Sequence, residues 1–280
     1  MDSLAPNEII AHVEIAATKK ANNATKKLFF LAILGGIYIS LGGVFAISVA
    51  AGAAGILPYG IIKLLMGLVF SLGLILIIIG GAELFTSSTL VCMAYFNREI
   101  KLKALLRSWG IVYFGNMIGS IATAILMFYS KQYTSGNGSV GVAAFNIASS
   151  KMHSSFAEEI ILGVFCNVLV CLAIWLTFGA KSTADKIVAI IFPISAFVAM
   201  GFEHSVANMF LIPITLFIKN IDPSFILFHN IDTSGITWIG FLTKNLLPVT
   251  IGNIIGGVFV WLSYWSIYSE KSYASQNKLN

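Results

Sequence analysis

Charged residues are scarce in this sequence. Only 10% of its 280 residues are Asp, Glu, Lys or Arg, whereas 58% are hydrophobic. A soluble domain carries about 25% charged residues. A surface exposed to water on all sides cannot be built from so few charges. The composition therefore excludes a cytosolic enzyme, a nucleic-acid-binding protein and a disordered chain. It predicts a membrane protein whose main surroundings are the lipid bilayer.

Cysteine is also scarce, and its placement indicates no special chemistry. Cys92, Cys166 and Cys171 all lie in apolar runs, with no metal-ligand spacing and no pattern of a disulfide framework. No phosphate-binding loop is present either. We expect no metal and no cofactor. The first 27 residues are polar and charged, without an early apolar core, which argues against a cleaved signal peptide.

The apolar residues form long runs. A helix that spans a bilayer needs about 20 mostly apolar residues. The sequence predicts six spans, at roughly 28–51, 60–95, 106–130, 156–180, 187–218 and 245–268. The second and fifth are too long or too interrupted for simple rods. The fold class expected is all-α.

The positions of the basic residues predict the orientation, because cytoplasmic loops of membrane proteins are enriched in Lys and Arg. With the N-terminus inside, twelve basic residues fall in inside segments: Lys19, Lys20, Lys26, Lys27, Arg98, Lys101, Lys103, Arg107, Lys181, Lys186, Lys271 and Lys278. Five fall outside: Lys63, Lys131, Lys151, Lys219 and Lys244. Both termini are therefore predicted to be cytoplasmic, with the six-helix transmembrane domain at 28–268 between an N-terminal segment, 1–27, and a tail, 269–280. Residues 6–27 mix apolar and charged residues, which predicts either an amphipathic helix at the cytoplasmic interface or a loose basic tail.

Two pairs of short motifs suggest an internal repeat. Gly-Asn-x-Ile-Gly occurs at 115–119 and at 252–256, and Gly-x-Glu occurs at 81–83 and at 201–203. Spans one to three and four to six thus resemble two copies of one unit. Since three is odd, the second copy must enter the membrane from the opposite side. Such 3+3 inverted repeats are common in transport proteins.

The two Gly-x-Glu motifs place a carboxylate inside an apolar span. Gly81 and Gly201 let the helix break, and irregular backbone at membrane depth is tolerated only where protein or water covers it. Intramembrane ionisable groups are costly and usually functional. Glu83 and Glu203 either satisfy the freed backbone N–H groups at the breaks or contact the substrate directly.

His204 is the only histidine deep in a predicted span. An imidazole can donate or accept a proton near neutral pH. His204 is therefore a candidate for a proton relay or for an orienting hydrogen bond. The Gly115/Gly119 and Gly252/Gly256 pairs predict close helix packing. The adjacent Asn116 and Asn253 are expected to bond across helices rather than to touch substrate.

Several longer motifs together resemble the formate/nitrite transporter family, over about residues 20 to 270. They are FSLGL at 70–74, ELFTSS at 83–88, YFGN at 113–116, CN through CLA at 166–173, GFEHSVANM at 201–209 and LPVT through GN at 247–253. Within the family the sequence is most similar to the formate channels. The Ser154–Phe156 segment departs from the His-Thr-Phe that often follows Lys-x-His in the family.

The resemblance implies an aquaporin-like protomer in a homopentamer, with one pore per protomer, in the cytoplasmic (inner) membrane. It implies that Leu74 lines the cytoplasmic constriction beside Leu84 and Phe85, and that Phe70 and Phe197 line the outer one. His204 is then expected between them near Thr86, and Asn167 and Asn208 are implied as polar wall residues. Lys20 and Lys151 match basic residues at the two vestibules.

The function predicted is passage of small monovalent anions of weak acids. Formate is the first candidate, and acetate and lactate are further ones. Vestibule lysines would concentrate the anion, and a proton supplied through His204 or by water would neutralise it for passage, which makes transport proton-coupled. A nitrite or hydrosulfide channel is the alternative within the class. A neutral-solute channel is another, although no Asn-Pro-Ala pair occurs. A membrane enzyme would need more catalytic groups than Glu83, Glu203 and His204.

Overall fold

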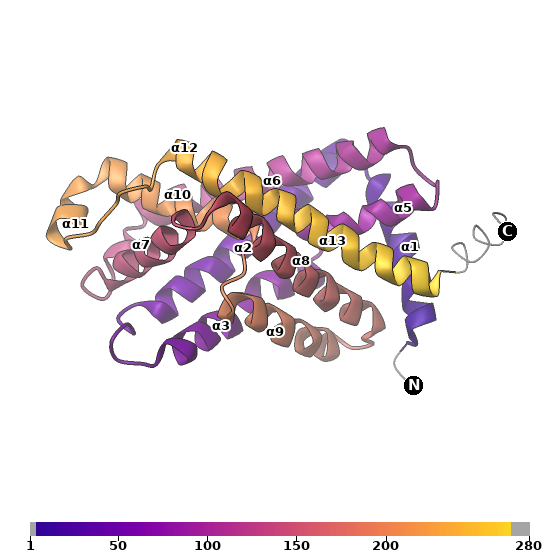
Figure 1. Cartoon of the computed structure of the whole chain (residues 1–280), viewed down its shortest axis with the longest axis horizontal. Helices are drawn as coiled ribbons and strands as arrows, with labels where there is room; N and C mark the ends of the chain where they lie inside the picture. The colour runs from indigo at the N-terminus through magenta and orange to yellow at the C-terminus, as the bar shows by residue number, and fades with distance from the viewer. Residues whose placement is uncertain (1–3, 270–280) are drawn as a thin grey trace.

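The computed structural model describes residues 4–269 and contains helices and no strand within that range. Figure 1 shows long helices running between the two ends of the molecule. The bounds are α1 Pro6–Ala21, α2 Thr25–Ala50, α3 Tyr59–Gly80, α4 Phe85–Ser88, η1 Thr89–Val91, α5 Cys92–Phe96, α6 Leu102–Tyr129, η2 Gln132–Thr134, α7 Ser139–Met152, α8 Phe156–Gly179, α9 Thr183–Ala199, α10 Ser205–Ile221, α11 Pro223–Phe228, α12 Trp238–Gly240, the π-helical η3 Phe241–Leu246, and α13 Leu247–Tyr268. The all-α fold class is confirmed.

Five helices of the described chain are long and apolar enough to cross a membrane: α2, α3, α6, α8 and the continuous stretch Trp238–Tyr268. The second predicted span, 60–95, is α3 followed by a break and the short apolar stretch Phe85–Phe96. The fifth, 187–218, divides into α9 and α10, of which neither alone meets the length of a span. The prediction that these two spans are interrupted is confirmed.

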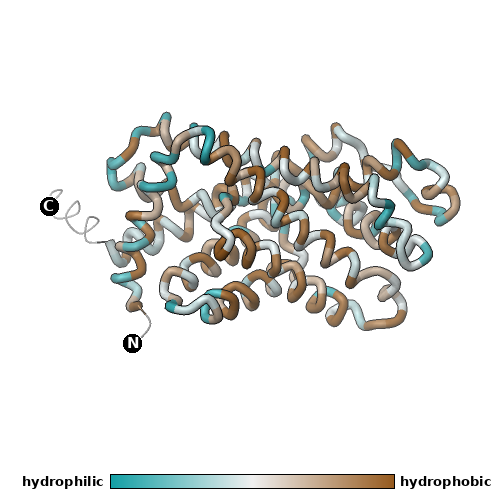
Figure 2. Tube along the Cα trace, turned by 180° about the vertical axis from the view of Figure 1, so that it is seen from behind, coloured by the Kyte–Doolittle hydropathy of each residue, from teal (hydrophilic) through white to brown (hydrophobic). Residues whose placement is uncertain are grey.

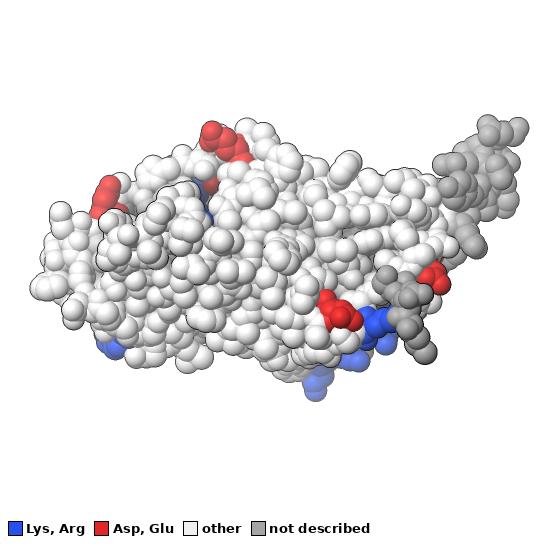
Figure 3. Space-filling view, turned by 90° about the horizontal axis from the view of Figure 1, so that it is seen from below, with Lys and Arg blue, Asp and Glu red and all other residues white. Residues whose placement is uncertain are grey.

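The outer surface of the helices is apolar. Many large apolar side chains on the long helices are exposed, among them Leu126, Phe192 and Phe259. Figure 2 shows hydrophobic residues along the helices. On the face in Figure 3, charged side chains are few, and a band across the middle carries none. Because such a surface is stable against lipid or other subunits and not against water, the chain is a multi-pass membrane protein.

Glycines bring the long helices into backbone contact. A Cβ atom at Gly119 of α6 would lie 2.1 Å from the Ile33 carbonyl oxygen of α2. A Cβ atom at Gly256 of α13 would lie 2.2 Å from the Val164 carbonyl oxygen of α8. Neither helix pair could approach this closely with any larger residue, so the predicted packing role of the two Gly-x-x-x-Gly motifs is confirmed.

The helix α1 lies at one end of the molecule, and α7 and α11 lie at the other (Figure 1). Ile9, Ile10 and Val13 of α1 are buried against the rest of the chain, beside α5 and α8. The segment expected either as an amphipathic helix or as a loose tail is therefore helical over Pro6–Ala21, with an apolar side turned to protein. Its placement at a membrane interface stays a prediction, and residues 270–280 of the predicted tail, with Lys271 and Lys278, lie outside the described range.

Candidate functional site

The helix breaks occur at the two predicted glycines. Gly81 has φ +80° and Gly201 has φ +74°, a left-handed conformation that side-chain-bearing residues rarely adopt. Each glycine ends the first part of a span, and three further residues precede the next helix, which begins at Phe85 or Ser205. Glycine is needed here because this residue adopts the left-handed backbone conformation that ends the first helix within the membrane.

The broken backbone is paired with a neighbouring helix. The Glu83 N–H donates to the Leu31 carbonyl of α2 at 3.0 Å, and the Glu203 N–H donates to the Leu162 carbonyl of α8 at 3.3 Å. These bonds satisfy backbone groups that would otherwise be stranded in an apolar surrounding. The same type of interhelical hydrogen bond therefore stabilises the broken backbone in both halves of the chain.

Asn116 and Asn253 hold the breaks from the facing helix. The Asn116 Oδ1 atom accepts from the Phe85 N–H at 2.8 Å, and its Nδ2 donates to the Glu83 and Ala32 carbonyls at 2.8 and 2.6 Å. Asn253 does the same in the second half: Oδ1 accepts from the Ser205 N–H at 2.9 Å, and Nδ2 donates to the Glu203 and Gly163 carbonyls at 2.9 and 2.8 Å. The prediction that both asparagines bond across helices is confirmed.

The Glu83 and Glu203 carboxylates are each paired with a lysine. Lys20 of α1 donates to Glu83, and Lys151 of α7 donates to Glu203 at 2.7 Å. Glu83 also accepts from the Ser88 hydroxyl at 3.2 Å. The carboxylates therefore bond to these side chains and not to the freed backbone N–H groups, which corrects one of the two predictions for them. The Glu83 and Glu203 N–H groups donate to carbonyls, and the Phe85 and Ser205 N–H groups donate to asparagines.

This pairing is what the sequence reasoning missed, since it treated lysines and glutamates separately. Several lysines precede each Gly-x-Glu motif, so no spacing in the sequence singled out Lys20 or Lys151 as the partner. The two pairs lie at opposite ends of the molecule, because α1 and α7 do (Figure 1). We call these ends the Lys20 end and the Lys151 end.

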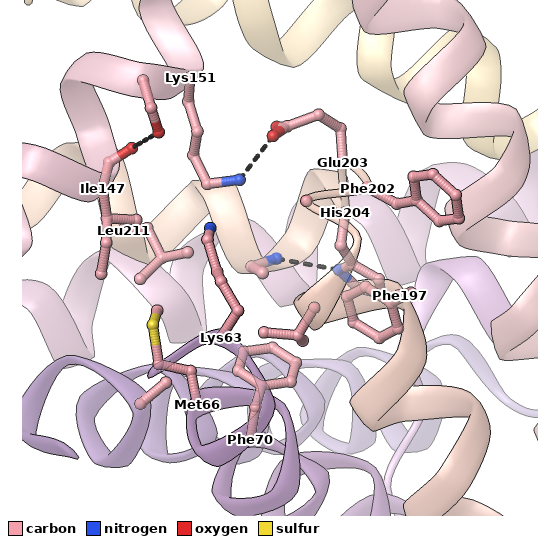
Figure 4. Close-up of a pocket in the computed structure, with 15 residues that line it drawn as sticks. Lys63, Met66, Phe70, Ile147, Lys151, Phe197, Phe202, Glu203, His204 and Leu211 are labelled. Atoms are coloured by element: carbon pink, nitrogen blue, oxygen red, sulfur yellow. Dashed lines mark hydrogen bonds and ion pairs between the residues drawn. The ribbon is translucent and has the colours of Figure 1, made fainter. Parts of the chain in front are cut away.

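A cavity of about 90 Å³ opens beside the second break, at the Lys151 end. Figure 4 shows Lys63 and Lys151 reaching into it from two helices, with the Lys151–Glu203 contact on one side. The Phe70 and Phe197 rings also line it and meet edge to face, with centroids 5.8 Å apart. The cavity therefore passes from a charged rim to an aromatic contact.

His204 lines the same cavity, beside this aromatic contact. Its ring stacks on Phe197 with centroids 5.9 Å apart, and it is 2% exposed. Its Nδ1 accepts from the Ala207 N–H at 3.0 Å, which caps α10. Because Nδ1 is an acceptor, the proton of a neutral ring is on Nε2, which donates to the Thr86 hydroxyl at 3.0 Å. The structure thus brings together His204, Thr86, Phe70 and Phe197 from three separate segments.

The other predicted site residues are buried around these breaks. Asn167 donates to the Thr86 carbonyl at 3.3 Å and to the Asn253 carbonyl at 2.5 Å. Asn208 donates to Glu203 at 2.6 Å and to Asn245 Oδ1 at 2.8 Å. The Asn208 side chain therefore supports the carboxylate pair, and it is not among the residues that line the cavity.

Leu74, Leu84 and Phe85, the residues expected at the other constriction, are all buried. The Phe85 ring meets the Tyr113 ring of α6 edge to face, with centroids 4.9 Å apart. None of the three lines the cavity at the Lys151 end. Their part in a constriction toward the Lys20 end stays a prediction.

Asn245 of η3 was not singled out from the sequence. Its amide contacts Asn208, Glu203, the Lys151 carbonyl and a further buried carboxylate, Glu159. It lies in the segment Lys244-Asn245-Leu246-Leu247-Pro248, just before a quoted motif. It directly follows the polar residues Thr243 and Lys244, so its sequence neighbours did not single it out.

Broken spans held by cross-helix asparagines, an apolar passage and lysines at both ends define a membrane channel or transporter. The formate/nitrite transporter family model matches residues 7–266, and the chain belongs to this family. The resemblance recognised in the sequence is thereby confirmed.

Individual relatives cover nearly the whole chain. The formate channel FocA of Escherichia coli strain K12 is 41% identical over 276 residues, covering 97% of this chain and 96% of the relative. The formate channel BtFdhC of Bacillus thuringiensis is 35% identical and covers 95% and 96%. A solved structure described as a pentameric formate channel with formate bound is 44% identical, with a TM-score of 0.82, covering 87% of this chain and 97% of that one.

Proposed function

We propose that this chain is the subunit of a homopentameric channel for formate, with one pore through each subunit. The family membership and the formate channels among its relatives support this. The observation that carries the proposal is the set of groups that line the cavity at the Lys151 end. These are lysines at its rim, two aromatic rings in contact, and one imidazole bonded to a hydroxyl. This arrangement suits a small anion: the lysines attract it, the aromatic rings displace its water, and the imidazole donates a hydrogen bond to it.

The pore is proposed to lie in the cytoplasmic (inner) membrane with the Lys20 end inside. The excess of basic residues in the predicted inside segments supports this orientation. The matching hydrogen bonds at Glu83 and Glu203 and at Asn116 and Asn253 support a 3+3 inverted repeat, because one set of contacts occurs twice in the same chain order.

The passage past Phe70 and Phe197 is apolar, which sets the energetic problem. A bare charge in such surroundings costs tens of kcal/mol before protein dipoles and residual water reduce it. The lysines raise the local anion concentration. The paired carboxylates hold each lysine in position and partly neutralise its positive charge. The anion is therefore attracted to the lysine but is not bound tightly. A weak acid that takes up a proton at the rim then crosses the aromatic contact as a neutral molecule.

His204 is proposed to orient the permeant and not to supply its proton. A neutral ring with its proton on Nε2 can donate a hydrogen bond. To become a cation it would need a second proton on Nδ1, where the Ala207 N–H already points. The proton for the permeant is then supplied by water in the vestibule.

The function is tested by counterflow of labelled formate in proteoliposomes. Nitrite, hydrosulfide, acetate, lactate and a neutral solute such as glycerol compete in turn at two pH values. We expect formate to compete best. Stronger competition by nitrite or hydrosulfide would assign the chain to the alternative within the class, and transport of glycerol alone would overturn anion transport. Native mass spectrometry in detergent is expected to give the mass of five subunits.

His204→Asn should lower formate flux but leave its pH dependence unchanged. Asparagine can accept from the Ala207 N–H as a helix cap and can donate, but it does not titrate. The measurement is formate flux in proteoliposomes over a pH series, compared with the wild-type chain. A pH profile that flattens in the variant would contradict the orienting role and show that His204 is the proton donor.

A further inference from the structure

A second buried carboxylate lies beside the Lys151–Glu203 pair and has no part in the function proposed above. Glu159, in the first turn of α8, is 0% exposed. Its Oε2 atom accepts from Asn245 Nδ2 at 3.2 Å. Its Oε1 atom accepts no hydrogen bond from any residue that the structure describes. A buried carboxylate oxygen without a donor is costly, so this group needs an explanation.

Glu159 and Glu203 share one amide group. Asn245 Nδ2 donates to Glu203 Oε2 at 3.3 Å as well as to Glu159 Oε2. The cation beside them is Lys151, which is held on the other oxygen of Glu203, Oε1, at 2.7 Å. Two carboxyl groups therefore meet in a buried cluster with one lysine in contact.

Lys63 of α3 lines the same cavity as Lys151 and Glu203 but contacts no carboxylate among residues 4–269. The remaining groups around Glu159 supply no other positive charge in contact with it. Asn208 of α10 donates to Glu203 and not to Glu159. The Ser154 hydroxyl, before α8, lies beside the Glu159 carboxyl. Cys166, farther along α8, is a buried thiol within electrostatic reach of Glu203 and Lys151. Other nearby titratable groups are Glu158, which is exposed and bonded to the Ser155 N–H, the neutral His204, and the exposed His153 and Lys244.

The other half of the chain lacks this second carboxylate. Leu31 and Leu162 make matching bonds, which fixes the register between α2 and α8. In this register Glu159 corresponds to Leu28, which is buried and apolar. By the matching bonds of Asn116 and Asn253, Asn245 corresponds to Ser108. The Lys20 end thus has one carboxylate for its lysine, and the Lys151 end has two.

Both carboxylates cannot be charged at once without leaving one negative charge buried and unpaired. The N-terminal end of α8 and Lys151 favour a charged Glu159, whereas its burial and Glu203 disfavour it. We propose that Glu159 holds a proton at the Lys151 end of the pore, and that losing this proton in alkaline solution reduces anion entry at this end. Glu159 then acts as a positioning residue through Lys151 and Glu203, and the carboxyl proton passes to the surrounding solution.

The effect on transport follows from charge. With its proton, the cluster is neutral in total and Lys151 attracts an incoming anion. Without it, a negative charge is added next to Lys151, which repels the anion and draws the ammonium away from the cavity. This inference rests on the proposed anion transport, and it adds a pH dependence that comes from the protein and not from the acidity of formate.

The test compares three variants with the wild-type chain in labelled-formate counterflow, with the same pH on both sides. Glu159→Gln copies the protonated carboxyl, Glu159→Leu copies Leu28 of the other half, and Glu158→Gln is the control at the adjacent exposed carboxylate. Between about pH 6 and about pH 8.5 we expect wild type and Glu158→Gln to lose roughly tenfold more flux than Glu159→Gln. The contribution of formate itself is common to all four proteins and cancels.

An infrared measurement gives an answer that does not depend on flux. The difference spectrum of wild type between about pH 6 and about pH 8.5, where exposed carboxyl groups stay ionised, should contain the carbonyl band of a protonated carboxylic acid, and Glu159→Gln should lack it. The proposal is overturned if the band is absent from wild type or persists in Glu159→Gln, or if Glu159→Gln has the wild-type flux profile. If wild type moved no formate, the proposed function would fail, while the infrared band would still decide the proton on Glu159.

Discussion

Lys151→Met should abolish most formate flux and also destabilise the protein. The substitution leaves the Glu203 carboxylate buried without its ammonium partner, which stands at 2.7 Å in the native chain. Removing one partner of a buried ion pair typically costs about 3–5 kcal/mol. Because this lysine also lies in the cavity at the Lys151 end, its loss removes attraction for the anion. We expect flux to fall by more than about tenfold.

The double variant Lys151→Met/Glu203→Gln separates the two effects. It removes both charges, so thermal stability in detergent should recover toward the wild-type value while flux stays low. Lys63→Met is the matched control, because Lys63 lines the same cavity but has no carboxylate in contact among residues 4–269. It should keep wild-type stability. Wild-type stability in Lys151→Met, or full recovery of flux in the double variant, would refute this account of the pair.

Asn253→Leu should unfold or severely destabilise the second broken span. It leaves the Ser205 N–H and the Glu203 and Gly163 carbonyls without the asparagine partners described above. A buried polar group that loses its partner costs about 1–3 kcal/mol, so three of them predict a loss of about 3 kcal/mol or more. The measurement is thermal unfolding in detergent, together with the yield of assembled protein.

The same change at Asn116 tests the equivalence of the two halves. Asn116→Leu frees the Phe85 N–H and two carbonyls in the same way and should cost a similar amount. The control is Asn146→Leu on the exposed side of α7, which should change stability little. If either buried variant were as stable as this control, cross-helix support of the breaks would be disproved.

The features predicted correctly from the sequence are those with a local chemical cause. A glycine two residues before a glutamate in an apolar run requires a helix break, and the structure has one at Gly81 and one at Gly201. Glycines four apart require close helix contact, which Gly119 and Gly256 make. The span limits were close too: the first, predicted at 28–51, is Thr25–Ala50.

The features that were missed depend on segments distant in sequence. Lys151 meets Glu203 only because α7 folds back over the second break, and no local pattern encodes that approach. Asn245 faces Glu159 and Glu203 from a π-helical turn, where the direction of a side chain departs from α-helical spacing. The hydrogen bond from the Ala207 N–H to His204 Nδ1 likewise depends on the helix that begins after the break, and no local pattern indicated it.

The contact between Phe70 and Phe197 has a kinetic consequence. Since the edge of one ring rests on the face of the other, a permeant on the proposed path can pass only while one ring swings aside. Side-chain rotations are much faster than motions of whole helices. Each passage would then need a brief rotation of one aromatic side chain and no rearrangement of the helices. A bulkier permeant would cross more slowly, because the larger rotation that it needs occurs less often.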